Sequence, residues 1–224
     1  MTTPTTIPEH LRTDLTALPE RIQALPIFRG YPVPWFVAYP NGPEGEPEFR
    51  TADGKKWIAA VQQKLCWVCG QQLGSWLAFV LGPMCGITRT TSEPACHREC
   101  AEWSIHNCPF LVRPHMVRRE DNLPEGVIDA PGCPLHRNPG VTALWITRTF
   151  TLFRAPDRRA LIRVGDPVEV GWFAEGRRAT RSEADHSIAG GLPSLIDLAK
   201  QDGPEAEAEL AQQVRDFEFY LPAK

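Results

Sequence analysis

Two short stretches decide the fold of this chain: Cys66-Trp-Val-Cys69-Gly70 and His97-Arg-Glu-Cys100, with 27 residues between Cys69 and His97. Two cysteines three positions apart and followed by glycine are typical of a zinc knuckle, a tight turn that aims both sulfurs at one ion. His97 and Cys100 have the same spacing, which on a helix places their Cβ atoms about 5–6 Å apart on one face. Four such donors complete a closed tetrahedral Cys₃His site. The sequence therefore predicts a structural zinc ion held by Cys66, Cys69, His97 and Cys100.

The residues between the two ligand pairs are expected to form a β-hairpin. Leu73–Leu81 favours a strand, Gly82-Pro83 favours a turn, and Met84–Thr90 would form the returning strand. Knuckle, hairpin and ligand-bearing helix is the order found in treble-clef zinc modules, and residues 66–108 resemble one. The resemblance implies a zinc module over residues 65–112. It leaves the function open, because treble clefs serve DNA, RNA and protein binding as well as nuclease chemistry.

The remaining cysteines are weighed by their distance from this site. Cys96 is the open alternative to His97, because it is the adjacent residue and lies one helical turn before Cys100. Cys108 would lie about 12 Å along the helix from Cys100. Cys85, near the hairpin tip, would lie at least about 13 Å from the knuckle. A second metal site stays open, and its candidate ligands are Cys85, Cys108, Cys133 and His136.

A catalytic interpretation competes with the structural one. His97-Arg-Glu99 matches the H-x-E element of zinc deaminases, in which the glutamate shuttles protons beside a zinc-bound water. Glu99 is therefore the candidate catalytic residue of a hydrolase-like or deaminase-like alternative. Four protein ligands would leave no position for water, however, so a non-enzymatic protein is the favoured prediction. Residues 73–90 also contain no histidine, which argues against the nucleases built on treble clefs.

Outside the zinc module, the sequence predicts further strands and helices, and with them an α+β fold. Three apolar runs, Val141–Phe153, Ala160–Val164 and Val168–Phe173, read as a three-stranded antiparallel β-meander. Thr180-Arg-Ser-Glu183 has the spacing of a capping box that begins the C-terminal helices, and Gly190–Pro193 is expected to end the first of them.

These elements divide the chain into four parts. The first part is rich in proline and holds an edge strand at Tyr31–Tyr39 and a short helix at Lys55–Lys64. The four parts are residues 1–64 as a lead-in, 65–112 as the zinc module, 113–140 as a loop, and 141–224 as the β-meander with the C-terminal helices.

Charge is distributed unevenly, although the net charge is only −3. Residues 136–181 carry nine Lys or Arg against four Asp or Glu, whereas residues 182–224 carry three against nine. The guanidinium group suits bidentate phosphate contact, so the basic region predicts weak nucleic-acid binding, with a protein partner as the alternative. The candidate nucleic-acid-binding residues are Arg148, Arg154, Arg158, Arg159, Arg163, Arg177, Arg178 and Arg181.

Composition narrows the class of protein further. With 42% hydrophobic and 23% charged residues, the chain has the composition of a globular domain and not of a disordered one. The uncharged stretch Leu65–Thr88 has only nine continuous apolar residues, too few for a membrane span. Met1–Leu11 lacks the pattern of a secretion signal, so we expect a cytoplasmic protein without membrane contact.

A wider resemblance covers several short strings. CWVCG, GPMC (ending at Cys85), HREC (Cys100), CPFL (from Cys108) and GRRATRSE are similar to proteins of unassigned function predicted in bacterial and bacteriophage genomes. The resemblance implies a cytosolic, phage-related setting. It transfers no catalytic residue.

Overall fold

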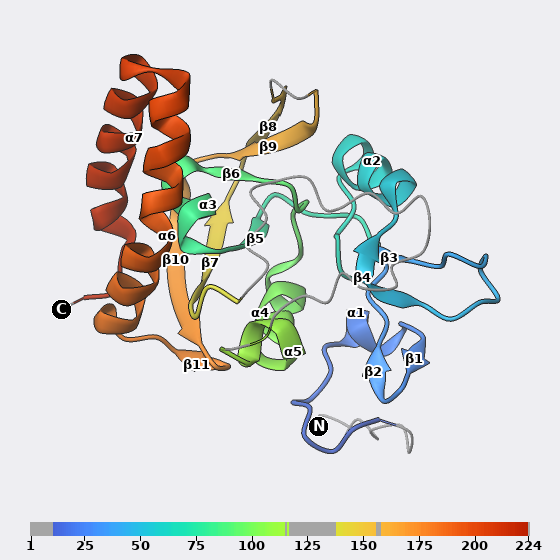
Figure 1. Cartoon of the computed structure of the whole chain (residues 1–224). Coiled ribbons are helices and arrows are strands. Elements are labelled where there is room, and N and C mark those ends of the chain that lie inside the picture. The colour runs from blue at the N-terminus through green and yellow to red at the C-terminus, as the bar shows by residue number, and fades with distance from the viewer. Residues whose placement is uncertain (1–10, 115, 117–137, 156–157, 224) are drawn as a thin grey trace.

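A four-stranded antiparallel sheet forms the centre of the computed structural model, which describes residues 11–114, 116, 138–155 and 158–223 (Figure 1). Helices and strands are mixed along the chain, so the predicted α+β class is confirmed. The order of the strands is β11-β10-β7-β5. Their bounds are Leu77–Leu81 for β5, Thr142–Thr147 for β7, Pro167–Ala174 for β10 and Arg177–Arg178 for β11.

Strand β7 is the centre of the hydrophobic core. All six of its residues are buried, and the side chain of Trp145 is completely inaccessible. Trp145 lies opposite Phe79 of β5 on one side and Val170 of β10 on the other. A strand buried on both faces reads as a continuous apolar run, which explains the segment Ala143–Ile146.

The predicted β-meander is wrong in its pairing. Strands β8 (Phe150–Arg154) and β9 (Ala160–Val164) pair with each other and with β6 (Thr90–Thr91) in a separate sheet of order β6-β9-β8. Strand β10 does not pair with β8 or β9 but with β7. The β8–β9 hairpin is thus inserted between two strands that are neighbours in the main sheet. Hydrophobic patterns located these strands, but such local patterns do not specify the partner of each strand.

The predicted hairpin between the ligand pairs is also wrong, in its second half. Strand β5 is followed by helix α3 (Pro83–Thr88) instead of a returning strand. Gly82 is the N-cap and Pro83 occupies the first helical position, where its fixed φ suits a helix, so Gly-Pro begins a helix here. The chain returns to β5 only at Ala78 and Cys96, which exchange two backbone hydrogen bonds of 3.0 and 2.7 Å.

Two long helices, α6 (Arg181–Asp202) and α7 (Pro204–Phe217), stand side by side along one side of the main sheet (Figure 1). The predicted capping box is confirmed. The Thr180 hydroxyl accepts a hydrogen bond from the amide of Glu183, and the Glu183 carboxylate accepts one from the amide of Thr180. A short 3₁₀ helix, η1 (Glu218–Tyr220), follows α7.

The prediction that the first C-terminal helix ends at Gly190–Pro193 is wrong, because α6 continues through Pro193 to Asp202. Proline inside a helix removes one backbone hydrogen bond. Helix α6 packs closely on α3 at this point. A Cβ on Gly191 would lie only 2.9 Å from the Met84 sulfur of α3. The glycine that looked like a stop signal is therefore a contact point between helices.

The described residues of the proline-rich first part, 11–64, form short strands and helices. Tyr31–Tyr39 is not a single edge strand, because the chain turns between β2 and β3 and the amide of Val37 donates to the carbonyl of Pro34 over 3.0 Å. The predicted helix at Lys55–Lys64 is confirmed as α2. The elements are α1 (Glu20–Gln23), β1 (Ile27–Phe28), β2 (Tyr31–Pro32), β3 (Val37–Ala38), β4 (Glu48–Ala52) and α2 (Gly54–Gln63).

The first part also packs on helix α4 (Arg98–Asn107), which is followed by α5 (Pro109–Val112). The Asn107 side chain accepts a hydrogen bond from the Thr16 amide over 2.8 Å and donates one to the Thr16 hydroxyl over 2.7 Å.

Within the described residues, no helix combines the length and apolar character needed to cross a bilayer.

Candidate metal centre

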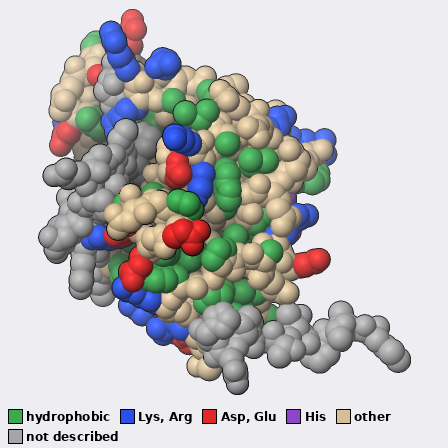
Figure 2. Space-filling model, turned by 90° about the vertical axis from the view of Figure 1, so that its right-hand side faces the viewer, with side chains coloured by type: hydrophobic (Ala, Val, Ile, Leu, Met, Phe, Trp, Pro, Cys, Tyr) green, Lys and Arg blue, Asp and Glu red, His purple; other side chains and the backbone are tan. Residues whose placement is uncertain are grey.

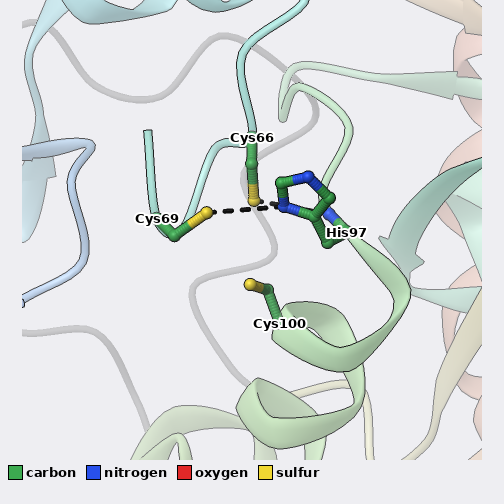
Figure 3. Close-up of side chains that lie close together, drawn as sticks. All are labelled: Cys66, Cys69, His97 and Cys100. Carbon is green, nitrogen blue, oxygen red and sulfur yellow. Dashed lines mark hydrogen bonds between the residues drawn. The ribbon is translucent and has the colours of Figure 1, made fainter. Parts of the chain in front are cut away.

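The first ligand pair lies in a tight turn directly after helix α2. The amide of Cys66 donates to the carbonyl of Gln71, and the amide of Gly70 donates back to the carbonyl of Cys66, each over 2.8 Å. These bonds close the turn over Cys69 and point both sulfurs to the same side (Figure 3). Gly70 has a φ of +72°, in the left-handed region that glycine adopts without a steric penalty.

Two separate features require glycine at position 70, so a substitution of Gly70 tests the knuckle. A Cβ at this position would lie 2.6 Å from Cγ of Trp35, in addition to the cost of the positive φ. We expect Gly70→Ala to lower the free energy of unfolding of the zinc-loaded protein by about 2–3 kcal/mol. Thermal melting and a chelator competition for zinc measure the effect.

Gly74→Ala is the matched control, because no atom lies within 4 Å of a Cβ built there. It should melt within about 2 °C of the wild type, a shift that corresponds to less than 1 kcal/mol. Equal melting temperatures for the two variants would show that the turn does not depend on the glycine.

The second ligand pair lies at the start of helix α4. His97 is the N-cap of this helix and Cys100 lies in its first turn, so the predicted spacing on one helix is present. The amide of Trp67 donates to the carbonyl of Ala95 over 3.0 Å, which fastens the knuckle to the segment before the helix. The amide of His97 donates to the Cys66 sulfur over 3.3 Å. Backbone contacts therefore bring the two pairs together.

The four side chains form one buried cluster. Their donor atoms lie within 4.8 Å of one another, and the Cys69 sulfur is 3.4 Å from His97 Nδ1 (Figure 3). Donors at 2.0–2.3 Å from one tetrahedral ion would be about 3.3–3.8 Å apart, so modest adjustment fits zinc into the cluster. His97 Nε2 lies 3.0 Å from the carbonyl of Gln72. An Nε2–H donor in that bond leaves Nδ1 as the lone pair facing the three sulfurs.

Without a cation, the three thiols cannot all be ionised together. Hydrogen bonds from the thiols of Cys100 and Cys69 lower the pKa of Cys66. The same bonds to Cys66 and Cys69 raise the pKa of Cys100. The bond of Cys69 with Cys100 lowers the pKa of Cys69, but its bond with Cys66 and its burial raise that pKa by more. The bond to Cys66 raises the pKa of His97. A divalent cation would relieve this repulsion between the sulfurs and displace the remaining protons.

Glu99 does not belong to the donor cluster. Its carboxylate accepts a hydrogen bond of 2.8 Å from Nε of Arg21. A second nitrogen of the same guanidinium donates to the Gln71 side chain. The shallow pocket beside the centre is lined by the side chains of this ion pair and by none of the four ligand residues; its lining is Glu20, Arg21, Gln23, Ala24, Gln71 and Glu99. The four ligand residues are buried and do not line this pocket.

The other cysteines lie outside this cluster. Cys96 is buried and its thiol hydrogen-bonds with Cys66, which raises the pKa of Cys96, but it is absent from the group of donors that lie within 4.8 Å of one another. Helix α4 ends at Asn107, directly before Cys108. Within the described part of the chain, Cys85 and Cys108 belong to no second group of three or more metal-ligating residues. Cys133 and His136 lie outside the described residues.

The structure does not bring the eight predicted arginines onto one surface. Figure 1 places the β8–β9 hairpin at one end of the molecule and β11 at the other. The first group lies in and beside the hairpin and consists of Arg148, Arg154, Arg158, Arg159 and Arg163. The second group lies at β11 and the start of α6 and consists of Arg177, Arg178 and Arg181.

Two residues near the centre carry no recognisable sequence signal. Arg21 is 78 positions from Glu99, and Gln72 contributes through its backbone carbonyl, which any residue would provide. Only the folded chain shows that Arg21 pairs with Glu99 and that the Gln72 carbonyl meets His97. No protein-family model, curated protein or solved structure matches the chain.

Proposed function

We propose that this chain is a non-enzymatic binding protein whose fold is held by a structural zinc ion on Cys66, Cys69, His97 and Cys100. The observation that carries the proposal is the closed donor set: three sulfurs and one imidazole nitrogen, all buried, lie within 4.8 Å of one another. Catalytic zinc sites keep one position for water, whereas structural sites fill all four with protein donors.

The contacts around the centre support a structural role. The centre joins the knuckle after α2 to the start of α4, and the Ala78–Cys96 bridge joins the same region to β5. An ion at this point would fix helix α4 relative to the main sheet. In this proposal, a treble-clef-type order of knuckle, strand and ligand-bearing helix is kept, with α3 in place of the second hairpin strand.

The position of Glu99 separates this proposal from the deaminase-like alternative. A proton shuttle needs a carboxylate beside a metal-bound water, and here the carboxylate is held by Arg21 on the pocket side. The proposed partner of the binding protein is a nucleic acid, and the phage-related setting implied by the sequence resemblance belongs to the same proposal.

X-ray absorption of the zinc-loaded protein tests the proposal. We expect three sulfur donors at about 2.3 Å and one nitrogen donor at about 2.0–2.1 Å, with no oxygen donor. Glu99→Gln should leave this spectrum, the zinc content and the melting temperature unchanged. An oxygen donor in the wild-type spectrum would favour the open site of an enzyme and would overturn the structural assignment.

A further inference from the structure

The β8–β9 hairpin is a two-stranded ribbon that extends beyond the sheets (Figure 1). Its strands pair residue by residue from Phe150↔Val164 to Arg154↔Ala160. Strand β6 supports only the base of the ribbon, at Arg163 and Ile162. The distal end is closed by backbone hydrogen bonds between Ala155 and Arg159 and between Arg158 and Ala155, of 2.9 and 2.8 Å.

The ribbon carries a concentrated positive charge. Residues 148–163 contain five arginines and one aspartate, a balance of +4 in a protein whose net charge is −3. Among the described residues, no carboxylate lies within ion-pairing distance of Arg148, Arg154 or Arg163. Their charges are therefore available to an external anion.

The arginines of the second group are in a different environment. Arg177 pairs with Glu183 over 2.6 Å, and Arg181 pairs with Asp185 over 2.8 Å and with Glu218. Because these carboxylates come from α6 and the residues after α7, the acidic C-terminal region neutralises its own neighbours. Arg177 and Arg181 are thus compensated by carboxylates, whereas Arg148, Arg154 and Arg163 are uncompensated by any carboxylate of the described residues.

Aromatic rings hold two of the uncompensated arginines in place. The Arg148 guanidinium lies 4.2 Å above the ring of Trp76, and that of Arg163 lies 5.4 Å from the ring of Phe153. Cation–π contact orders a guanidinium without neutralising its charge. Bases of a single strand bind by stacking on aromatic rings, but here an arginine already lies over each ring. Backbone phosphates therefore fit this surface better than unpaired bases do.

We propose that the β8–β9 hairpin binds the phosphate backbone of double-stranded nucleic acid, with Arg148, Arg154, Arg158 and Arg163 as contacts. A two-stranded ribbon has the width that the major groove of B-form DNA admits. Among the described residues on the face drawn in Figure 2, Lys, Arg, Asp and Glu side chains are interspersed. The inference rests on the proposed function, because it names the partner of the zinc-stabilised binding protein.

Fluorescence anisotropy of the full-length, zinc-loaded protein with a labelled 20-base-pair DNA duplex tests the proposal. We expect a dissociation constant in the micromolar range at 50 mM salt, within the usual range of non-specific binding. Four phosphate contacts predict a slope of log K against log salt of about −3 to −4. The double variant Arg154→Ala/Arg163→Ala should raise the dissociation constant at least 10-fold and reduce the slope by about 2.

The matched control is Arg177→Ala/Arg178→Ala, which removes the same charge from exposed positions on β11. It should change the dissociation constant less than threefold. Both double variants should keep one zinc ion per chain and the wild-type melting temperature, so failure of duplex binding is distinguishable from failure of the zinc proposal.

Four results would overturn the assignment: no binding at 50 mM salt, binding that does not depend on salt, equal losses in the two double variants, or at least 10-fold tighter binding of the single strand than of the duplex. Vesicles containing phosphatidylserine form the last arm of the experiment. Binding to these vesicles without binding to the duplex would assign the hairpin to a lipid surface and reject a nucleic-acid partner.

Discussion

Cys100→Ser should remove the zinc ion and with it the largest single contribution to the stability of this protein. Cys100 is completely buried and lies in the first turn of α4. Structural zinc sites contribute their binding free energy to folding, and a loss of about 5 kcal/mol in a chain of this length lowers the melting temperature by about 10–20 °C. Metal analysis and thermal melting measure both effects.

Two controls separate loss of the metal from loss of packing. Chelation of zinc from the wild-type protein should reproduce the melting temperature of Cys100→Ser, since both remove the same ion. Cys85→Ser should keep one zinc ion per chain, because Cys85 lies on α3 outside the donor cluster. One equivalent of zinc in purified Cys100→Ser would disprove the ligand set.

The same site fixes the direction of the pH dependence. Thiolates and neutral imidazole are the forms that bind zinc, so protons compete with the metal. Zinc should be held at and above neutral pH and released as the pH falls into the acidic range. The melting temperature should then fall together with the zinc content, and it should not fall before the zinc is released.

Trp145→Ala is expected to cause the second largest loss, about 3–5 kcal/mol in the free energy of unfolding. The ring is fully buried in the central strand, lies 5.1 Å from the ring of Tyr220, and is covered by the guanidinium of Arg89 at 5.4 Å. Its Nε1 donates a hydrogen bond to the carbonyl of Gly165 over 3.0 Å. Removal of the indole leaves a cavity between β7, η1 and the turn after β9. Denaturant unfolding measures the loss.

Trp76→Ala is the comparison within the same residue type. Trp76 is 49% exposed and its packing partner is the Arg148 guanidinium, so its removal should cost about 1 kcal/mol or less. Trp145→Phe keeps most of the packing and should lie between the two. Similar losses for Trp145→Ala and Trp76→Ala would show that β7 is not the centre of the core.

The sequence was most informative where its signals are local. Two pairs of residues with a spacing of three place their side chains on one turn or one helix face, so the donor cluster could be predicted without the rest of the fold. The capping box at Thr180–Glu183 and helix α2 are local in the same sense. Arg21 could not be predicted, because its contact with Glu99 depends on how the first part of the chain crosses α4.

Pairing between strands could not be predicted from the same patterns. Strands β8 and β9 are both apolar enough to belong to a meander, and nothing in their sequence states that β10 pairs with β7. Gly82-Pro83 was ambiguous for a different reason, since the same dipeptide suits a turn and the start of a helix. Burial of β7 on both faces resolves the first ambiguity, and the close packing of α3 under α6 resolves the second.

The pairing of β5 with β7 has a consequence for synthesis of the chain on the ribosome. Strand β5 ends at Leu81 and β7 begins at Thr142, so 60 residues must be added between them. At the usual 5–20 residues per second, β5 waits about 3–12 s for its partner. Both zinc ligand pairs emerge during this interval, and the Ala78–Cys96 bridge can form with them. The edge of β5 that pairs with β7 nevertheless stays open until β7 is made, and an open strand edge is a template for pairing with another chain.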